Sequence, residues 1–311
     1  MLGKKVNDIR IKKHETIGQL VKSFAGTGGF TAKKLAVAEE IFKSMEKDKE
    51  CVRFLSFPAD IISTGTRGVI RDMIKNKLFD VVITTAGMID HDLARMWKDY
   101  YAGTEKTDDA QLRKEGINRL YNIFIPNSSY GYILEEKLRP ILDDAAKVKK
   151  QYSTSEIVAF IGEKIKKERR AGETITYWAW KNKIPIIIPG FTDGSFGSQI
   201  WMHYQRDRQF IINPLEDENL LADLVFKAKR TGALMLGGGI SKHHTIWWNQ
   251  FHNGLDYAIY MTTAVDWDGS LSGAKLEEAV SWGKVNPKGK QITVEGDVTV
   301  LLPLLYASYI D

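Results

Sequence analysis

The sequence predicts an α/β fold in which a mostly parallel sheet is covered by helices on both faces. Several segments are continuously apolar, as buried parallel strands are, instead of alternating between apolar and polar residues. Each is followed by a glycine-containing polar turn and then by a stretch with helical spacing. The chain has 311 residues, of which 43% are hydrophobic and 27% are charged, so it can bury a substantial core.

The first predicted elements alternate between helix and strand. Residues 31–48 have apolar positions at helical spacing, with Thr31 as the expected N-cap. A buried strand is expected at 51–57, a helix at 66–78, and a second strand at 79–87 that ends in small residues. Further strands with their glycine and polar turns are expected within 183–195, 231–244 and 255–270.

The middle of the chain has a different pattern. Residues 88–182 are expected to be mostly helical, with amphipathic stretches at 135–150 and 155–170 and a turn at 129–132. No low-complexity linker, proline-rich hinge or repeat divides the sequence. We therefore expect a single domain over 1–311, with an N-terminal helical arm at about 1–48 and a helical insertion at about 88–182.

Composition excludes several classes of protein. The net charge of +5 is mild, and the basic clusters at 147–150 and 164–170 have acids nearby, so no nucleic-acid partner is expected. No apolar run is long enough to span a membrane, and the basic N-terminus lacks the apolar block of a secretory signal, so we expect a cytoplasmic protein. Cys51 is the only cysteine, and its apolar neighbours favour a small buried side chain. No cluster has metal-ligand spacing, so no metal is expected.

The turns after the predicted strands contain the polar candidates for a site. In open parallel sheets, ligands bind beyond the carboxyl ends of the strands. The glycine run in 236–244 includes Gly238 and Gly239, which would let a pyrophosphate approach the backbone at a helix start, although a tight turn also uses such glycines. Asp-Gly-Ser turns contain Asp193 and Asp268, which could bind ribose hydroxyls or a substrate ammonium group, although Asp and Gly are also common turn residues.

Lys284 and His243 are the candidates for chemistry. Lys284 follows Trp282 and Gly283 among apolar neighbours. Partial desolvation would disfavour its ammonium form and make the free amine available as a nucleophile. His243 follows the glycine run at a helix start, where it is either a structural histidine or a proton carrier.

The motifs together resemble the deoxyhypusine synthase family. The resemblance rests on LGGGISKHH (236–244), on NGLDYAIYMTTAVDWDGSLSGAKLEEAVSWGKV (253–285) and above all on SWGK (281–284). Matching motifs occur in the same order at 84–95, 116–127, 177–186 and 191–195, so the likeness extends from about residue 20 to the end. It implies a Rossmann-like homotetramer that uses NAD.

The resemblance also implies a reaction. NAD removes hydride from spermidine, a lysine captures the aminobutyl portion as an imine, and 1,3-diaminopropane leaves. A lysine of the translation initiation factor 5A precursor then takes the aminobutyl group, and the retained NADH reduces the new imine. The partners implied are thus a polyamine and this precursor protein.

The same resemblance assigns roles to residues of this chain. Lys284 matches the covalent lysine and His243 the active-site histidine, while Trp282 and Glu278 match residues that contact the amine. The segments that match the family's NAD-binding segments contain Asp60, Ser63, Thr85, Ala86, Gly87, Asp193, Gly238, Gly239, Thr263, Asp268, Gly269 and Asp297.

The chain departs from the family pattern in the predicted amine pocket. His91, Ser198 and Leu271 stand where acids are expected, and Asp60 stands where asparagine is usual. Spermidine carries several ammonium groups near neutral pH, and each buried charge-assisted hydrogen bond contributes about 1.5–3 kcal/mol. Losing two would weaken binding by at least about a hundredfold. Either Asp90, Asp266 or Glu277 compensates, or the preferred amine is not spermidine.

Alternatives to this function remain open at the level of sequence. The donor could be another polyamine, such as agmatine. A homospermidine synthase-like enzyme would pass the aminobutyl group to putrescine. A catalytically silent, NAD-binding regulatory paralogue would explain the lost acids, but the retained Lys284, His243 and Glu278 oppose it.

Overall fold

The computed structural model describes residues 5–311, which pack into two compact units. The first unit consists of the chain up to Phe57 together with Leu221–Asp311, and the second is Pro58–Leu220. Helix α10 (Leu215–Lys227) spans the boundary between them. The single domain expected from sequence stays a prediction, and each unit is described by itself. No helix among residues 5–311 is both long and apolar enough to cross a membrane.

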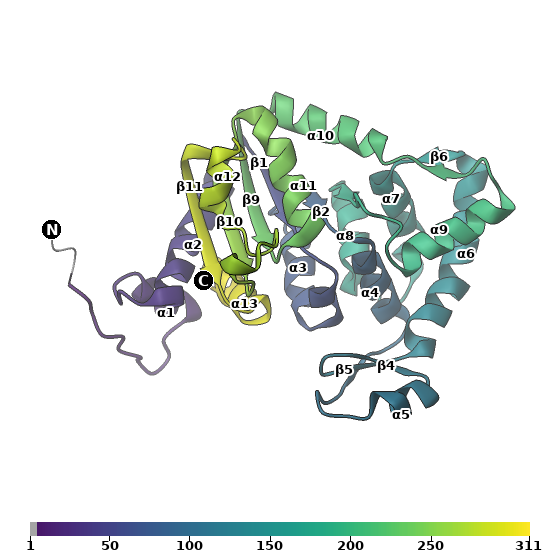
Figure 1. Cartoon of the computed structure of the whole chain (residues 1–311), viewed down its shortest axis with the longest axis horizontal. Coiled ribbons are helices and arrows are strands. Elements are labelled where there is room, and N and C mark those ends of the chain that lie inside the picture. The colour runs from purple at the N-terminus through teal and green to yellow at the C-terminus, as the bar shows by residue number, and fades with distance from the viewer. Residues whose placement is uncertain (1–4) are drawn as a thin grey trace. The chain divides into compact units, whose positions relative to one another are not determined.

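The first unit is built on parallel strands. Strands β1 (Cys51–Ser56), β9 (Arg230–Leu236), β10 (Leu255–Thr262) and β11 (Val285–Glu295) lie in the order β11-β10-β9-β1 (Figure 1). All of these pairings are parallel. Of these strands, β1, β9 and β10 correspond to predicted apolar runs, whereas β11, which is largely polar, was not predicted. In β9 every residue from Thr231 to Leu236 is buried. Because successive side chains point to opposite faces, both faces of this strand are covered.

Helices pack directly on these strands. The first unit contains α1 (Ile17–Phe24), α2 (Phe30–Lys47), α11 (Gly239–Asn249), α12 (Leu276–Ser281) and α13 (Val298–Ile310), with short 3₁₀ turns η5 (Gln250–His252) and η6 (Asp266–Asp268). Helix α2 contacts β1, β10 and β11, α13 contacts α2 and β10, and α11 contacts β1 and β9.

The start of α2 differs from the prediction. Its N-cap is Gly29, not Thr31, and the expected arm is helical only from Ile17 onward within the described residues. The Thr31 hydroxyl donates to the carbonyl of Glu295, 3.0 Å away. Because α2 already begins at Phe30, Thr31 lies inside its first turn and not at the cap position, so the cap prediction was wrong.

The second unit is mainly helical around two short pairs of parallel strands. Strand β2 (Val81–Ile83) pairs with β7 (Ile186–Ile187), and β6 (Gln151–Tyr152) pairs with β8 (Ile211–Ile212). Its helices are α3 (Thr66–Lys75), α4 (Ala86–Trp97), α6 (Gly131–Val148), α7 (Thr154–Lys164), α8 (Ile175–Asn182) and α9 (Ser195–Arg206), with 3₁₀ turns η1 (Asp60–Ser63), η2 (Asn127–Ser129), η3 (Ile165–Lys167) and η4 (Ala171–Glu173). The strand predicted at 79–87 is shorter than expected because α4 already begins at Ala86. Within 183–195 only Ile186–Ile187 form a strand, and turns occupy most of the chain from there to the start of α9.

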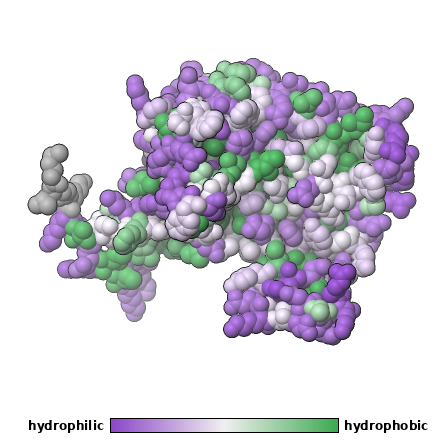
Figure 2. All heavy atoms as spheres, in the orientation of Figure 1, coloured by the Kyte–Doolittle hydropathy of each residue, from purple (hydrophilic) through white to green (hydrophobic). Residues whose placement is uncertain are grey.

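The predicted helical insertion also contains a small antiparallel sheet. Its order is β3-β5-β4, from β3 (Tyr101–Ala102), β5 (Ile123–Pro126) and β4 (Ile117–Leu120), and α5 (Asp109–Lys114) precedes β4. In Figure 2 the visible surface of this segment is mostly hydrophilic. The sequence pattern missed the hairpin because its strands are short and mostly half-buried, and so they contain no long apolar run.

Buried carboxylates fix three helix starts in the second unit. Asp90 accepts hydrogen bonds from the first amides of α9, Asp92 from those of α8, and Asp217 from those of α7. The first amides of a helix have no partner within the helix, and the helix dipole favours negative charge there. These acids therefore position helices that are distant from them in sequence.

Candidate functional site

Lys284 is held at the end of α12 by a specific turn. Trp282 is the C-cap, and Gly283 has a φ of 69°, in the left-handed region that glycine adopts without steric cost. Gly283 donates to the carbonyl of Val280, and Lys284 donates to the carbonyl of Ala279. This pair of bonds is the Schellman motif. It explains the glycine of SWGK, because the chain must reverse there to enter β11.

The Lys284 side chain is buried beside an imidazole and two indoles. Only 8% of the residue is exposed. Its Nζ lies 3.3 Å from Nε2 of His243, and 5.5 Å and 5.3 Å from the ring centroids of Trp247 and Trp282. Trp247 follows His243 by one helical turn on α11, so both side chains lie on the same face.

His243 is suited to accept a proton from this lysine. Burial lowers the pKa of its imidazole, and the nearby charges of Lys284, His244 and Lys242 lower it further. A lysine ammonium can only donate hydrogen bonds, so His243 must accept at Nε2 when it bonds to the ammonium form of Lys284. A neutral imidazole can accept in this way. The structure thus brings together the two residues predicted to be catalytic.

The glycine turn after β9 packs against a second loop. The residues Ser270–Ala274 are called here the 270–274 loop. A Cβ placed on Gly238 would lie 2.4 Å from Cα of Ser272, whereas a Cβ on Gly239 would meet open space. Glycine is therefore needed at 238 for loop packing, a reason that differs from the predicted approach of a pyrophosphate. Gly238 is also the N-cap of α11 and offers no side chain to its first amides.

The remaining predicted residues of the first unit lie at its surface. Thr263, Asp268, Gly269, Leu271 and Glu278 are exposed, and Trp282 is 66% exposed. Asp268 accepts a hydrogen bond from the amide of Ser270 at 2.7 Å. Asp297 is the N-cap of α13, where it accepts bonds from the amide and hydroxyl of Thr299. Their proposed contacts with ligands stay predictions.

In the second unit, the predicted cofactor residues cluster at helix starts. Thr85 is the N-cap of α4, and Ala86 and Gly87 begin that helix. A Cβ on Gly87 would lie 2.8 Å from the Cβ of Ala59, so the helix start packs closely on the chain before η1. The other members of this set are Asp60 and Ser63 in η1 and exposed Asp193 before α9. Ser198, which was predicted for the amine pocket, is exposed within α9.

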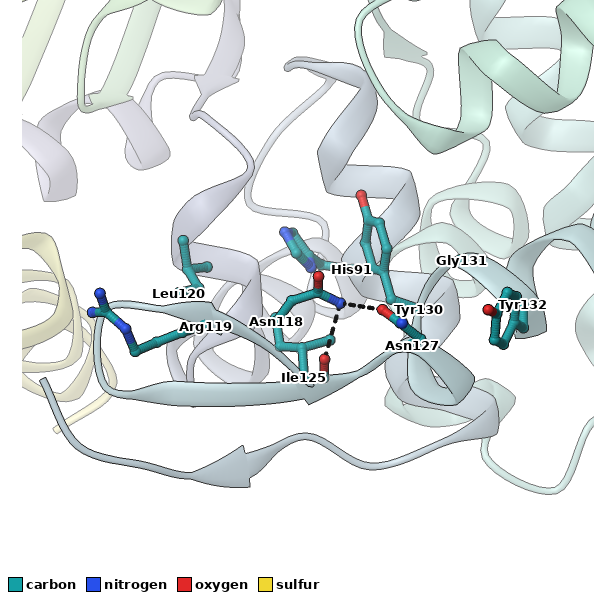
Figure 3. A pocket seen from close by; sticks show the side chains of 9 residues that line it. All are labelled: His91, Asn118, Arg119, Leu120, Ile125, Asn127, Tyr130, Gly131 and Tyr132. Atoms are coloured by element: carbon teal, nitrogen blue, oxygen red, sulfur yellow. Dashed lines mark hydrogen bonds between the residues drawn. The ribbon is translucent and has the colours of Figure 1, made fainter. Parts of the chain in front are cut away.

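His91 borders a pocket of about 590 Å³ that is also lined by residues of the β4–β5 hairpin (Figure 3). Its Nδ1 lies 2.9 Å from the hydroxyl of Tyr100, and its ring packs 5.4 Å from that of Tyr130. The described residues that line the pocket are His91, Asn118, Arg119, Leu120, Ile125, Asn127, Tyr130, Gly131 and Tyr132, which include no carboxylate. Arg119 is already paired with Asp109 at 2.6 Å. The pocket is thus aromatic and polar but has no anionic group for an ammonium.

Comparison with known proteins places the chain in a family. The model of deoxyhypusine synthase matches residues 19–309. The chain belongs to the deoxyhypusine synthase family. It is 56% identical over 310 residues to a protein named "Probable deoxyhypusine synthase" from Picrophilus torridus, covering 100% of this chain and 98% of that one. A protein of the same name from Thermoplasma volcanium is 51% identical over 310 residues, with the same coverage.

The fold agrees with that assignment. The crystal structure of a "putative deoxyhypusine synthase from Entamoeba histolytica" superposes with a TM-score of 0.70 at 20% identity, covering 98% of this chain and 96% of that one. At this identity the likeness concerns the fold alone. It supports the α/β class predicted from the apolar strands.

Three acids could compensate for the substituted positions of this deoxyhypusine synthase-family chain, and two of them already have partners within the protein. Asp90 accepts from the hydroxyl of Tyr130 at 2.8 Å in addition to the two amides of α9. Asp266 is paired with Lys275 at 2.7 Å. Glu277 is exposed on α12. Of the three acids, Glu277 alone has no ion pair or hydrogen bond described here.

Two contributors to the site were not predicted from sequence. Trp247 could have been found, because it lies four residues after His243 on a predicted helix and must share its face. Lys242 is almost fully buried, with 2% exposure, next to His243 in the chain. No sequence signal marks it, because its partners are carbonyl groups of the 270–274 loop.

Asp90 and His91 are expected to give opposite pH dependences of stability. Burial raises the pKa of Asp90 from 3.8 to about 6, so its contribution is present below pH 3.8 and is lost as pH rises to about 6. Burial lowers the pKa of His91 from 6.5 to about 4, so its contribution is present above pH 6.5 and is lost as pH falls to about 4. Each amounts to roughly 3 kcal/mol, and the two largely cancel.

Single variants should separate the two effects. Asp90→Asn should leave a free energy of unfolding that rises between pH 4 and 6.5, whereas His91→Gln should leave one that falls between about pH 4 and 6. Urea unfolding at intervals of pH measures both slopes. Parallel pH profiles of the two variants would contradict the assignment.

Proposed function

We propose that this protein transfers an aminobutyl group from spermidine or a related polyamine, through an imine on Lys284, to a lysine of the translation initiation factor 5A precursor, with NAD as cofactor. The observation on which this depends is the buried amine of Lys284 at 3.3 Å from the His243 imidazole. The family membership of the chain supports the same reaction class.

Lys284 and His243 have complementary tasks in such a transfer. The unprotonated Nζ of Lys284 attacks the carbon of the donor imine and forms a new C–N bond. The bond from that carbon to the departing diamine then breaks, and the diamine leaves with its electron pair and a proton. His243 Nε2 is placed to take the proton that Lys284 must lose before it attacks. The same steps in reverse order pass the aminobutyl group to the acceptor lysine.

Residues of the first unit fit a dinucleotide. Helix α11 begins with amides that have no side-chain cap, and a Cβ on Gly239 meets open space. Such a helix start attracts phosphate oxygens. The exposed carboxylate of Asp268 is suited to ribose hydroxyls. When bound, NAD would supply a reversible hydride transfer. The hydride removed from the donor amine is returned to the product imine, so the overall reaction has no net oxidation.

The indole groups near Lys284 have a further role in this proposal. Trp247 and Trp282 lie within 5.5 Å and 5.3 Å of Nζ and limit the access of water to it. Exclusion of water protects an imine from hydrolysis.

The identity of the polyamine is tested together with the reaction. The purified protein is incubated with NAD and spermidine, putrescine or agmatine, with and without the factor precursor, and then treated with borohydride. We expect a mass increase of one aminobutyl group on Lys284 without acceptor, and on a precursor lysine with it. Formation of homospermidine with putrescine would identify the acceptor as a small amine. Failure of every amine to modify Lys284 would refute covalent transfer.

A further inference from the structure

Lys242 is a buried cation whose two hydrogen-bond acceptors both belong to one surface loop. Its Nζ donates to the carbonyls of Leu271 and Ala274, at 3.0 Å and 2.5 Å, and lies 3.9 Å from the ring centroid of Tyr260. The residue is 2% exposed. A buried ammonium is unfavourable unless hydrogen bonds replace its hydration, and here two carbonyls and an aromatic face do so.

Residues of β10 and of the glycine turn before α11 also contact the 270–274 loop. The hydroxyls of Tyr260 and Thr262 on β10 both donate to the carbonyl of Ser272, at 2.5 Å and 3.2 Å. Gly238 packs closely against Ser272. The 270–274 loop is thus attached to α11 and β10 through its carbonyl groups, and Lys242 provides the only charged contact among these bonds.

The first residue of the 270–274 loop, Ser270, is hydrogen-bonded to the Asp268 carboxylate. The amide of Ser270 donates to Asp268 Oδ1 at 2.7 Å, and Leu271, whose carbonyl binds Lys242, follows Ser270. The segment from Asp266 to Leu271 is otherwise exposed. An exposed segment with few internal bonds samples many conformations unless its ends are fixed.

We propose that Lys242 is a positioning residue, which fixes the 270–274 loop and thereby holds the Asp268 carboxylate ready for the vicinal hydroxyls of a nucleotide ribose. This inference rests on the proposed function for the identity of the ligand. The fixing of the loop by Lys242 does not depend on it. Burial lowers the pKa of Lys242 to about 8, while Glu278 opposes that shift, so the ammonium form prevails at neutral pH.

The test compares Lys242→Met with Lys227→Met, in which an exposed lysine of α10 paired with Asp223 is removed instead. Hydrogen exchange of the peptide over 266–275 measures loop order. Calorimetric titration with NAD measures affinity. Reductive alkylation of Lys284 by butanal and cyanoborohydride, located by peptide mapping, reports on the reactive amine without NAD.

We expect Lys242→Met to speed exchange in 266–275 and to raise the Kd for NAD, each by at least about tenfold, the factor that corresponds to one lost charge-assisted hydrogen bond. Alkylation of Lys284 should stay within about threefold of the wild-type rate, and Lys227→Met should change none of the three. Should Lys242→Met not fold, Tyr260→Phe removes one loop hydrogen bond and keeps the ring, and it should shift exchange and Kd in the same direction.

The outcomes are distinguishable. Unchanged exchange in 266–275 overturns the proposed fixing of the loop, and faster exchange with an unchanged Kd overturns its link to ribose binding. Loss of Lys284 alkylation along with NAD binding would mean a general structural role and would also overturn the proposal. If the wild-type protein itself does not bind NAD, the proposed function fails, while the exchange result still decides whether Lys242 fixes the loop.

Discussion

Lys284→Ala is expected to abolish the borohydride-trapped adduct and to lower aminobutyl transfer by at least about a thousandfold. The variant removes the proposed nucleophile, and neither His243 nor the nearby indoles can form an imine. Mass spectrometry of the trapped protein and a product assay measure the two effects. The free energy of unfolding should change little or rise, because the buried amine is costly.

Lys288→Ala is the matched control. Lys288 lies on the same strand, β11, and its side chain is exposed. This variant should retain the adduct on Lys284 and transfer within about twofold of the wild type. Equal loss in both variants, or a persisting adduct in Lys284→Ala, would contradict the assignment of the nucleophile.

The second large effect concerns stability. Asp92→Ala is expected to lower the free energy of unfolding by about 3–5 kcal/mol, because it leaves buried partners without their acceptor. Asp92 is fully buried and accepts from the amides of Ile175 and Thr176 and from the hydroxyl of Thr176. It also lies 3.8 Å from the guanidinium of Arg67, itself 5% exposed. Urea unfolding followed by circular dichroism measures the loss.

Asp108→Ala provides the comparison for this measurement. Asp108 performs the same task at α5, where it accepts from the amides of Ala110 and Gln111, but it is exposed to solvent. Removing this carboxylate should lower the free energy of unfolding by about 1 kcal/mol, because water can replace the lost acceptor. Similar losses in both variants would show that burial does not determine the contribution of these caps.

The sequence predicted the parts of the fold that repeat a simple pattern. The strands β1 and β10 lie within the predicted apolar segments and β9 begins one residue before its segment, because burial on both faces leaves a continuous apolar run. The β4–β5 hairpin was missed, because its residues are mostly half-exposed and mixed in character. The cap at Thr31 was wrong because α2 begins at Phe30, so Gly29 takes the cap position and Thr31 falls inside the helix.

The site could be predicted only in its separate parts. Family motifs indicated Lys284 and His243, but only the structure shows that their nitrogen atoms are 3.3 Å apart across 41 positions of sequence. Lys242 was overlooked because carbonyl partners leave no trace in the amino-acid pattern. The pyrophosphate role of Gly238 stays a prediction, and packing against Ser272 already requires a glycine at that position.

The turn at Gly283 has a consequence for the rate of reaction. The amide of Lys284 donates to Ala279, and its carbonyl accepts from the amide of Leu255, so the main chain is immobilised on both sides of the reactive residue. Only side-chain torsions remain to be ordered when the amine meets an electrophilic carbon. For the proposed transfer, the main chain around Lys284 is thus ordered during folding, and only the side chain and the substrate itself remain to be positioned.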